Sequence, residues 1–460
     1  MRPRLETARD QLPALLRRSA GTRAKDLAKL AQVSPATMLR VLTEAGASVV
    51  RVGRTSATRY YLRRALRGLN TPIPVYAVDV EGGALQVGEL HLIAPNGTVL
   101  DVAAMGWPVD KEFALGVWPD GLPYPLQDMR PQGFLGRQFA LHESTALGVP
   151  ANPKDWDDDA VLHVLLQRGV DTPGNLILGD TALQLWLRSK AAPPEVLTQE
   201  TIGPGYAQAA ALASARGAAG SSAGGEFPKF TALRDLPGAQ TQHVIVKYTA
   251  DDRSDTVQRW SDLLVCEHLA LQALRTVDGL SCANSRIVQE GGRTYLEIER
   301  FDRHGLYGRS PLCSLEAIEA SQLPSTSGNW GAAADMLHAC GWITSAAVQM
   351  VKTIWAFGRL IGNSDMHRGN LSFVPASMMQ VAPVYDMLPM MFAPLQGGEI
   401  PSVSFAPELP MPADKPAWDQ ASKAAQAFWL SASQDFRISA PFRTLCDDKL
   451  KVLDRLMALA

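Results

Sequence analysis

The sequence predicts an α+β protein with a small helical unit at its N-terminus, a β-rich middle and a largely helical C-terminal part. Apolar residues follow a helical spacing between Leu12 and Ala45, and a change to strand-like alternation with Gly-rich turns begins at Thr71. Amphipathic helices return over residues 418–430 and 449–459. At about 150 residues per domain, a chain of 460 residues provides for several folded units.

The composition excludes several classes of protein. Hydrophobic residues make up 46% and charged residues 20%, so the chain is neither disordered nor fibrous. No apolar run reaches the roughly 20 residues of a membrane helix, and the first residues lack a signal-peptide pattern. The five cysteines form no CxxC pair. We therefore expect a cytoplasmic protein without structural zinc and without a membrane partner.

The net charge of -2 is unevenly distributed along the chain. Residues 1–68 hold fifteen lysines and arginines against four acids, whereas the remainder holds 29 bases against 42 acids. A basic block beside an acidic body favours local contact with a polyanion. The sequence therefore predicts a nucleic-acid contact at this end of the chain.

Three helices and a hairpin are expected within the basic block. Leucines at helical spacing predict two helices before Ser34. Ser34 suits a helix N-cap and Pro35 the first helical position, so a third helix is expected from here to Ala45. Residues 49–62 place two apolar runs around a basic, Gly-containing tip, which is typical of a hairpin.

This order of elements resembles a winged helix-turn-helix domain over residues 1–68. In such a domain the start of the recognition helix meets base edges, and basic residues of the wing meet phosphates. The resemblance implies that DNA is contacted by Ser34, Thr37, Arg40, Arg54 and Arg59. Two alternatives remain open: a small helical domain with a solvated basic face, or a module that docks on the chain's own acidic body.

Residues 72–150 are expected to form a small β-rich domain. Three apolar runs, over residues 74–80, 85–93 and 98–102, alternate with Gly-Gly and Asn-Gly turns. The histidines of the first 200 residues stand alone in the sequence, and a lone histidine is usually structural. We therefore expect no chemical site before residue 200.

A run of small residues follows an alanine-rich helix over residues 207–225. Small residues let the backbone come close to a ligand, as in phosphate-binding loops. The run leads into Lys229. A flexible Gly/Ser linker would have the same composition, so this segment alone does not decide between the two.

A lysine and a glutamate twenty residues apart are candidates for a phosphate clamp. Lys247 ends a short apolar strand, and Glu267 lies on the largely apolar face of a helix expected over residues 260–274. In a kinase-type site a strand lysine grips the nucleotide phosphates and a helix glutamate holds that lysine. The ordinary alternative is a surface lysine and a glutamate at the edge of the core.

The segment after Gly362 carries the strongest chemical signal. Asp365 and Asn370 have the spacing of a phosphotransferase catalytic loop, in which the aspartate orients the attacking hydroxyl and the asparagine holds magnesium. Asp386 follows a short apolar run sixteen residues after Asn370. Because Mg²⁺ binds through one or two carboxylates plus substrate phosphates, Asp386 and Asn370 suffice as ligands, and Asp365 stays available as the base.

Together these segments resemble the HipA-like serine/threonine kinase toxins. The resemblance rests on Ser222–Lys229, Lys247, Glu299–Arg303, Asn363–Asn370 and Tyr385-Asp386, and covers about residues 75–455. It implies a bilobal protein-kinase-like domain. The N-lobe, with the phosphate loop, is expected over residues 151–300 and a helical C-lobe, with the catalytic loop, over residues 301–460.

The resemblance also implies ATP and Mg²⁺ as cofactors and a role for each matching residue. The catalytic residues are Asp365, Asn370, Asp386 and Lys247, with Asn370 and Asp386 holding the metal and Glu267 positioning Lys247. The ATP-binding residues are Ala223, Gly224, Gly225, Lys229, Lys247, Glu299, Arg300, Phe301, His367, Arg368, Gly369, Asn370, Tyr385 and Asp386. Autophosphorylation of Ser222, or of the adjacent Ser221, would eject the loop and switch the enzyme off.

Two features depart from the family pattern. The chain carries its own DNA-binding-type unit, whereas the best-known members work with a separate DNA-binding antitoxin, and Glu226-Phe227-Pro228 precedes the loop lysine. An antitoxin partner and a protein substrate are expected, but the sequence names neither. The main alternative is a transcriptional regulator whose kinase-like body only senses nucleotide or docks a partner. A DNA-damaging enzyme is disfavoured, because no HxH, HNH-like or clustered-carboxylate pattern is present.

Overall fold

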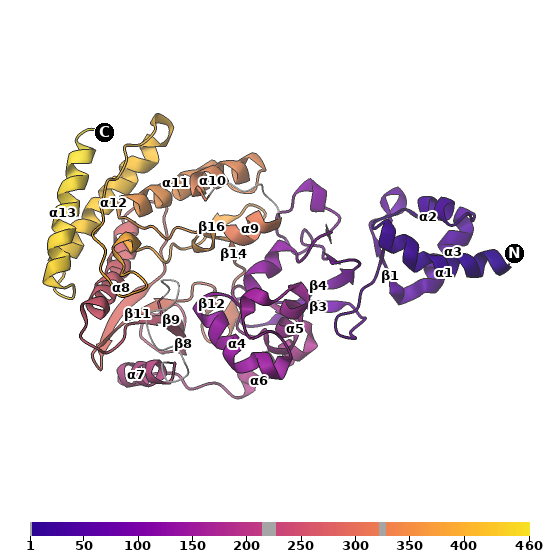
Figure 1. Ribbon diagram of the computed structural model, residues 1–460, viewed down its shortest axis with the longest axis horizontal. Helices are drawn as coiled ribbons and strands as arrows, with labels where there is room; N and C mark the ends of the chain where they lie inside the picture. Colours follow the sequence, from indigo (N-terminus) through magenta and orange to yellow (C-terminus); the bar gives the residue numbers. More distant parts are fainter. Residues whose placement is uncertain (1, 214–226, 322–327) are drawn as a thin grey trace.

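The computed structural model describes residues 2–213, 227–321 and 328–460, and every structural statement below concerns those residues. An N-terminal module, residues 2–68, projects from a larger body that contains several small sheets and a helical C-terminal part (Figure 1). No helix in the described ranges has the length and apolar character needed to cross a membrane. The mixture of helices and sheets confirms the predicted α+β class.

The N-terminal module contains three helices and a hairpin. Its elements are α1 (Arg2–Arg18), α2 (Ala24–Leu30), α3 (Pro35–Ala45) and the antiparallel strands β1 (Val49–Val52) and β2 (Arg59–Leu62). Leu12, Leu27 and Met38 bring one side chain from each helix into a common core. As predicted, Ser34 caps α3: its Oγ accepts a hydrogen bond of 3.1 Å from the backbone N–H of Thr37.

The hairpin of this module also packs on the body. Val50, Val52 and Tyr61 share an apolar cluster with Ile93 and Val99 of the neighbouring sheet. Next to the cluster, the guanidinium of Arg64 lies 2.6 Å from the carboxylate of Asp159. The hairpin is therefore held against the body through both apolar and ionic contacts.

A five-stranded antiparallel sheet follows the module along the chain. Its order is β6 (Val117–Trp118), β5 (Gly97–Val99), β4 (Ala84–Ile93), β3 (Ile73–Val78) and β7 (Leu176–Leu178), and helices α4 (Gly133–Leu147), α5 (Asp158–Arg168) and α6 (Gly179–Ala191) belong to the same stretch of chain. β7 lies beyond the predicted boundary at residue 150, yet it pairs with β3 as an edge strand. The sheet therefore includes a strand from residues 151–300, which were predicted to form a separate N-lobe.

The second large sheet is also antiparallel and lies between two helices (Figure 1). Its order is β10 (Ser285–Glu290), β11 (Arg293–Glu299), β9 (His243–Tyr248) and β8 (Lys229–Leu233). The helix α7 (Ile202–Ala213) packs on the face that presents Val244 and Val246. The helix α8 (Asp255–Leu274) shares the main core with Leu296 and Ile298, which belong to the other face.

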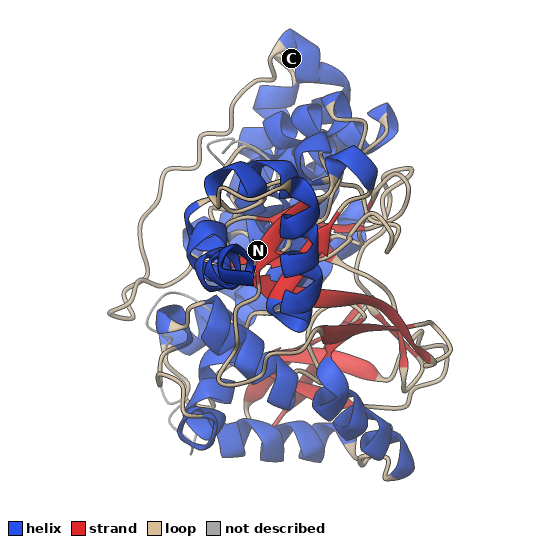
Figure 2. Cartoon of the chain, turned by 90° about the vertical axis from the view of Figure 1, so that its right-hand side faces the viewer, coloured by secondary structure: helices blue, strands red, loops and turns tan. Residues whose placement is uncertain are grey.

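The C-terminal part is mainly helical. It contains α9 (Leu315–Ser321), α10 (Trp330–Ala339), α11 (Ser345–Leu360), α12 (Lys415–Gln434) and α13 (Ala440–Met457). Small antiparallel sheets join it to the rest: β12 (Arg303–His304) with β13 (Gly308–Arg309), and β14 (Cys313–Ser314), β15 (Ser372–Val374) and β16 (Gln380–Val381) together. Figure 2 shows helices around the C-terminus at the top and most strands lower in the molecule.

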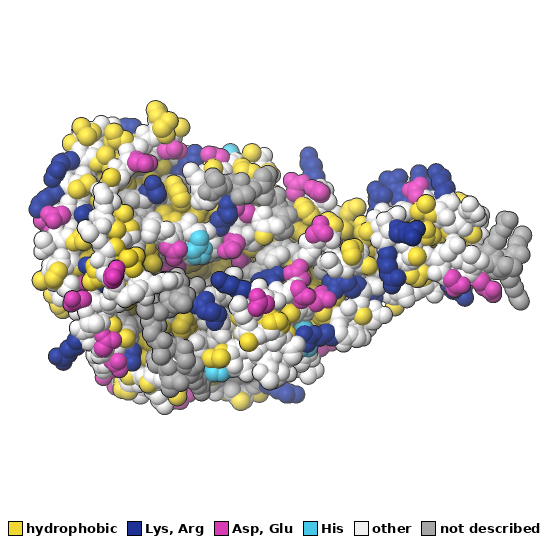
Figure 3. Space-filling model, viewed as in Figure 1, with side chains coloured by type: hydrophobic (Ala, Val, Ile, Leu, Met, Phe, Trp, Pro, Cys, Tyr) yellow, Lys and Arg dark blue, Asp and Glu magenta, His cyan; other side chains and the backbone are white. Residues whose placement is uncertain are grey.

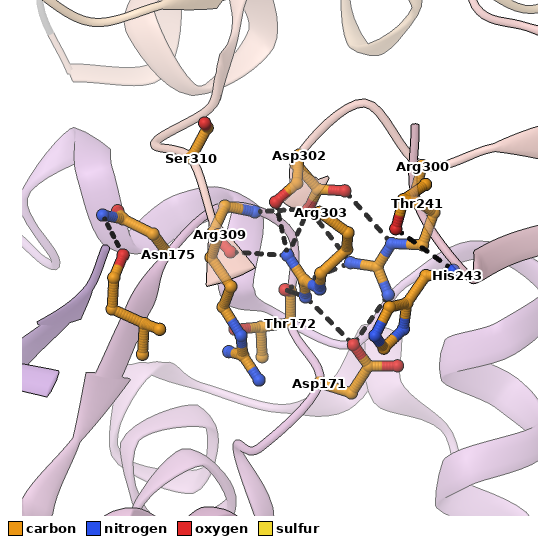
Figure 4. A network of polar contacts seen from close by, with 12 residues as sticks. Asp171, Thr172, Asn175, Thr241, His243, Arg300, Asp302, Arg303, Arg309 and Ser310 are labelled. Carbon is orange, nitrogen blue, oxygen red and sulfur yellow. Dashed lines mark hydrogen bonds and ion pairs between the residues drawn. The ribbon is translucent and has the colours of Figure 1, made fainter. Parts of the chain in front are cut away.

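A buried ionic network joins the five-stranded sheet unit to the chain that leaves β11 (Figure 4). The guanidinium groups of Arg300 and Arg303 both contact Asp171, at 2.7 and 2.9 Å, and both contact Asp302, at 3.0 and 2.7 Å. Asp302 also accepts a 3.0 Å hydrogen bond from the backbone N–H of Gly174. Because Asp302 and both arginines are buried, each charge depends on the others for solvation.

Replacing Asp302 by alanine should lower the free energy of unfolding by about 3 kcal/mol, because two buried guanidinium groups lose a shared carboxylate. Urea denaturation followed by tryptophan fluorescence measures the change. Asp251→Ala is the matched control: Asp251 is 62% exposed and, within the described ranges, its one ion pair is with Arg293, so its loss should cost less than about 1 kcal/mol. Equal shifts of the two denaturation midpoints would contradict a supporting role for the network.

Candidate active site

A buried lysine ammonium is the centre of the candidate site. Lys247 is 5% exposed, and its Nζ lies 2.8 and 2.7 Å from the two carboxylate oxygens of Glu267. The same Nζ lies 2.5 Å from Oδ1 of Asp386. The structure thus brings together a strand lysine, a helix glutamate and an aspartate that are far apart in the sequence. Both carboxylates raise the pKa of Lys247 against the opposing effect of its burial.

Strand alternation decides which way Lys247 points. Val244 and Val246 pack toward α7, so the intervening residues of β9 face α8. On α8, Glu267 is fully buried among apolar neighbours. Burial raises the pKa of the Glu267 carboxyl, and the charge of Lys247 opposes that increase. The contact with the lysine therefore favours the ionised form of the glutamate.

Asp386 lies in a loop with a backbone conformation that is uncommon for an aspartate. Its φ is +55°, in the left-handed region. Burial would raise the pKa of its carboxyl, but the positive charges of Lys247 and Lys229 lower that pKa to about 2. Asp386 is therefore ionised at neutral pH, as a carboxylate ligand of a cation must be.

The loop that carries Asp365 is held by two asparagines. Oδ1 of Asn363 accepts a 3.0 Å hydrogen bond from the backbone N–H of Asp365. Nδ2 of Asn370 donates a 3.0 Å hydrogen bond to the backbone carbonyl of Asp365. These contacts fix the backbone on both sides of an exposed aspartate. The side chain of Asn370, five residues after Asp365, thus closes the loop by its hydrogen bond to the backbone.

The loop is also joined to the segment that contains Asp386. The hydroxyl of Tyr385 donates a 2.5 Å hydrogen bond to the carbonyl of Gly369 and lies 2.8 Å from Oγ of Ser372. The ring centroid of Tyr385 is 5.7 Å from that of Phe301. Tyr385, Gly369 and Phe301, all predicted to bind ATP, therefore lie close together.

Other predicted ATP-binding residues are engaged elsewhere. The side chain of Glu299 pairs with Arg234 at 2.5 Å, and that of Arg300 belongs to the ionic network described above. Arg368 pairs with Glu319. Nδ1 of His367 accepts a 3.1 Å hydrogen bond from the N–H of Gly369. The backbone N–H groups of Glu299 and Arg300 are used as well, by the carbonyls of Asn284 and His243 at 2.8 and 3.0 Å.

The phosphate-loop prediction falls partly outside the described residues. Ser221, Ser222, Ala223, Gly224, Gly225 and Glu226 all lie there. Lys229 is described: it is directly opposite Lys247 in the pairing of β8 with β9. Its charge contributes to the low pKa of Asp386, which places it in the electrostatic field of the site.

Two residues of the site were not predicted from the sequence. Asn363 supports Asp365 as described, and its Nδ2 also lies 3.5 Å from the backbone carbonyl of Asp386. The ring of Phe227 lies 5.8 Å from Nζ of Lys247. An asparagine two residues before the aspartate is a signal that the sequence does contain, whereas nothing local indicates the position of Phe227.

The donor set fits a magnesium ion bound together with phosphates. In the described ranges, no three His, Cys, Asp or Glu side chains converge as a metal site. Magnesium in phosphotransferases does not need such a cluster, because phosphates and water complete its coordination. The ionised carboxylate of Asp386 and the amide oxygen of Asn370 are oxygen ligands of the appropriate kind.

The predicted DNA-contacting residues lie on the N-terminal module, away from Lys247. Ser34 and Arg40 are exposed on the side of α3, Thr37 is half-buried, and Arg54 is exposed at the hairpin tip. Arg59 instead donates a 3.3 Å hydrogen bond to the carbonyl of Gly21 within the module. Figure 3 shows lysine and arginine side chains gathered over this module.

Comparisons with known proteins place this fold and site in one family. A family model described as YjjJ-like toxin, middle domain, matches residues 69–187, and one described as HipA-like C-terminal domain matches residues 221–443. The latter range contains every residue of the site around Lys247. The chain belongs to the HipA-like toxin family.

One curated relative is similar over nearly the whole chain. Toxin YjjJ of Escherichia coli (strain K12) is 37% identical over 426 residues, which cover 92% of this chain and 93% of that protein. Among solved structures, HipA of the Shewanella oneidensis MR-1 toxin–antitoxin complex aligns with a TM-score of 0.46 and 17% identity, over 84% of this chain and 94% of that chain. The Helicobacter pylori proinflammatory kinase CtkA aligns with a TM-score of 0.34 and 12% identity, over 52% and 94% of the two chains.

Replacing Lys247 by methionine should destabilise the protein in a pH-dependent way, because Glu267 then has no cation in a fully buried position. The raised pKa of Glu267 in the folded variant makes the penalty small below about pH 4.3, the ordinary pKa of a glutamate. The loss of stability grows as the pH rises from there to the raised pKa and levels off above it. We expect a loss of about 3 kcal/mol at pH 8 and a smaller loss at pH 5, measured by urea denaturation.

Lys352→Met is the control for this measurement. Lys352 pairs with Asp335 and Asp414, which are 57% and 49% exposed, so its removal leaves no buried charge. Its effect on stability should be small and nearly equal at pH 5 and pH 8. A Lys247→Met penalty that does not change with pH would contradict the pairing of Lys247 with an ionised Glu267.

Proposed function

We propose that the chain is an ATP- and Mg²⁺-dependent serine/threonine protein kinase that acts as a toxin in the cytoplasm by phosphorylating a protein target and arresting growth. The contact of Lys247 with both Glu267 and Asp386 carries this proposal. A buried lysine held by a helix glutamate and next to an ionised aspartate is the arrangement that phosphoryl transfer from a nucleotide requires. Similarity to a protein named as a toxin supports the biological role.

Each residue of the site has a distinct task in this proposal. Glu267 holds Lys247 in place, and Lys247 contacts the nucleotide phosphates. Asp386 and Asn370 hold the metal, which supplies charge neutralisation for the transferred phosphoryl group. Asp365 orients the attacking hydroxyl and accepts its proton, and Asn363 keeps its backbone in place. Catalysis here consists mainly of positioning and charge stabilisation.

Autophosphorylation is proposed as the off-switch. A phosphate on Ser222 or Ser221 would add close to two negative charges near the loop lysine. Asp386 and Glu267 already place two carboxylates around Lys247. The added charge would eject the loop from the site, as the resemblance implies, and so stop the reaction.

DNA binding through residues 1–68 is the second part of the proposal. The capped start of α3, with Arg40 exposed, and the exposed Arg54 at the hairpin tip support it, because a winged helix-turn-helix domain contacts DNA from such positions. The alternative function, a regulator whose body only senses nucleotide or docks a partner, rests on this same module. A separate antitoxin partner stays a prediction.

The kinase proposal predicts transfer of phosphate in purified protein. Incubation with ATP and Mg²⁺, followed by mass spectrometry of the peptide that contains Ser221 and Ser222, should show phosphate in the wild-type chain. Asp365→Ala and Asp386→Ala should each reduce the rate at least about 100-fold, because they remove the base and the metal ligand. The rate of ATP turnover provides a second measurement.

Asp278→Ala is the matched control for these variants, because Asp278 is exposed on the surface outside the site. It should leave both rates within twofold of wild type. Full activity and full growth arrest in both Asp365→Ala and Asp386→Ala would refute the kinase assignment. Loss of growth arrest only in variants of residues 1–68 would favour the regulator.

DNA binding should depend on Arg40 and on salt. Arg40→Ala should weaken binding to duplexes selected from a random library about tenfold and relax their sequence preference, as expected for a base contact. Arg188→Ala, an exposed arginine of α6, should have no effect, and Asp365→Ala should bind DNA as wild type does. Fluorescence anisotropy at salt concentrations between about 50 and about 200 mM measures the DNA affinity of each variant and its dependence on salt. Salt-independent binding, or none at all, would contradict this part of the proposal.

A further inference from the structure

A cavity of about 510 Å³ lies directly beside the catalytic loop. Its walls come from α10, α11, the start of α12 and the segment of residues 404–411. Asn363 and Ser364 form part of its lining. Because Asp365 is the next residue along the chain, a ligand in this cavity lies within a few residues' length of the proposed catalytic base.

One wall of the cavity offers an unpaired backbone. In the described chain, no hydrogen bond between backbone groups involves residues 402–410, and these residues belong to no helix or strand. Pro407 and Pro410 have no N–H, but the other residues keep their donors and all keep their acceptors. Such a wall is complementary to another extended polypeptide, which has the same alternation of donors and acceptors.

The cavity also contains an aromatic surface with an unused donor. Trp355, Phe405 and Trp418 all line it. Trp418 is 6% exposed, and its indole N–H has no hydrogen-bond partner among the described residues. A buried donor without an acceptor is unfavourable in the free protein. A carbonyl group of a bound segment would satisfy it, while an apolar side chain covers the rings.

The charged residues of the cavity are mostly acidic. Asp335, Asp414 and Glu408 line it together with two cations, Lys352 and Arg359. Lys352 is shared by Asp335, at 3.1 Å, and Asp414, at 3.4 Å. Glu408 is exposed and makes no ion pair within the described ranges. A basic side chain of a ligand would therefore find an available carboxylate at Glu408.

We propose that this cavity binds an extended segment of the protein substrate, with an apolar side chain against the aromatic surface and a basic side chain at Glu408. This inference rests on the proposed kinase function and names the part of the molecule that selects the substrate. The backbone of residues 404–409 and the Trp418 indole hold the main chain of the segment. The serine or threonine to be phosphorylated is separated from the apolar and basic side chains by a fixed, small number of residues and reaches Asp365.

A positional-scanning library of serine- and threonine-centred peptides tests the proposal. The wild-type enzyme should prefer one apolar and one basic residue at fixed offsets from the acceptor. Ala332→Trp places a large side chain in the cavity from the exposed face of α10 and should raise the KM for the preferred peptide at least tenfold, with unchanged ATP affinity. Ala346→Trp, on an exposed position of α11 outside the cavity, is the matched control.

Two further substitutions sharpen the test. Glu408→Lys should exchange the preference for a basic residue for an acidic one at the same offset, without changing kcat for the best peptide. Trp418→Phe removes the indole N–H together with one of the two fused rings and should raise the KM several-fold. Equal KM values for wild type, Ala332→Trp and Glu408→Lys would overturn the cavity assignment. A wild-type enzyme that phosphorylates no peptide and does not autophosphorylate would instead refute the kinase function itself.

Discussion

The ammonium group of Lys247 is the interaction on which the rest of the site depends. It is buried and contacts two carboxylates that belong to different parts of the chain, one on α8 and one in the loop at Asp386. Removing the charges of Lys247 and Glu267 from water is costly, and their close mutual contact offsets much of the cost. A shift of the β9 strand against the α8 helix would therefore leave a buried charge without its partner, whereas Asp386, which is 29% exposed, adds a second carboxylate from the edge of the site.

Features governed by local rules could be predicted from the sequence. The cap at Ser34, the helix that follows Pro35 and the hairpin over residues 49–62 depend on neighbouring residues only. The pairing of Lys247 with Glu267 was also predicted, because strand and helix periodicity place each side chain on one face of its element. The contact of Lys247 with Asp386 was not predicted: Asp386 lies in a loop and was expected only as a metal ligand. Asp365 and Asn370 belong to one loop and are joined by a hydrogen bond, so their spacing in the sequence is enough to predict that they lie close together.

Features that depend on distant pairing could not be predicted. β7 joins β3 across about 100 residues of intervening chain, and no local signal marks it as part of that sheet. Glu299 and Arg300 match the family pattern in sequence, but their side chains are taken up by Arg234 and by the network around Asp302. The partners of these groups come from elements whose approach is decided by the packing of whole sheets and helices.

The packing of the β1–β2 hairpin on the five-stranded sheet has a geometric consequence for a chain bound to DNA. Because Val50, Val52 and Tyr61 share a core with the body, the orientation of α3 is coupled to the orientation of a mass several times larger. Two copies on a palindromic duplex would occupy half-sites separated by whole helical turns. The bulk of the two bodies, rather than the reach of α3, would then decide which operator spacings are sterically allowed.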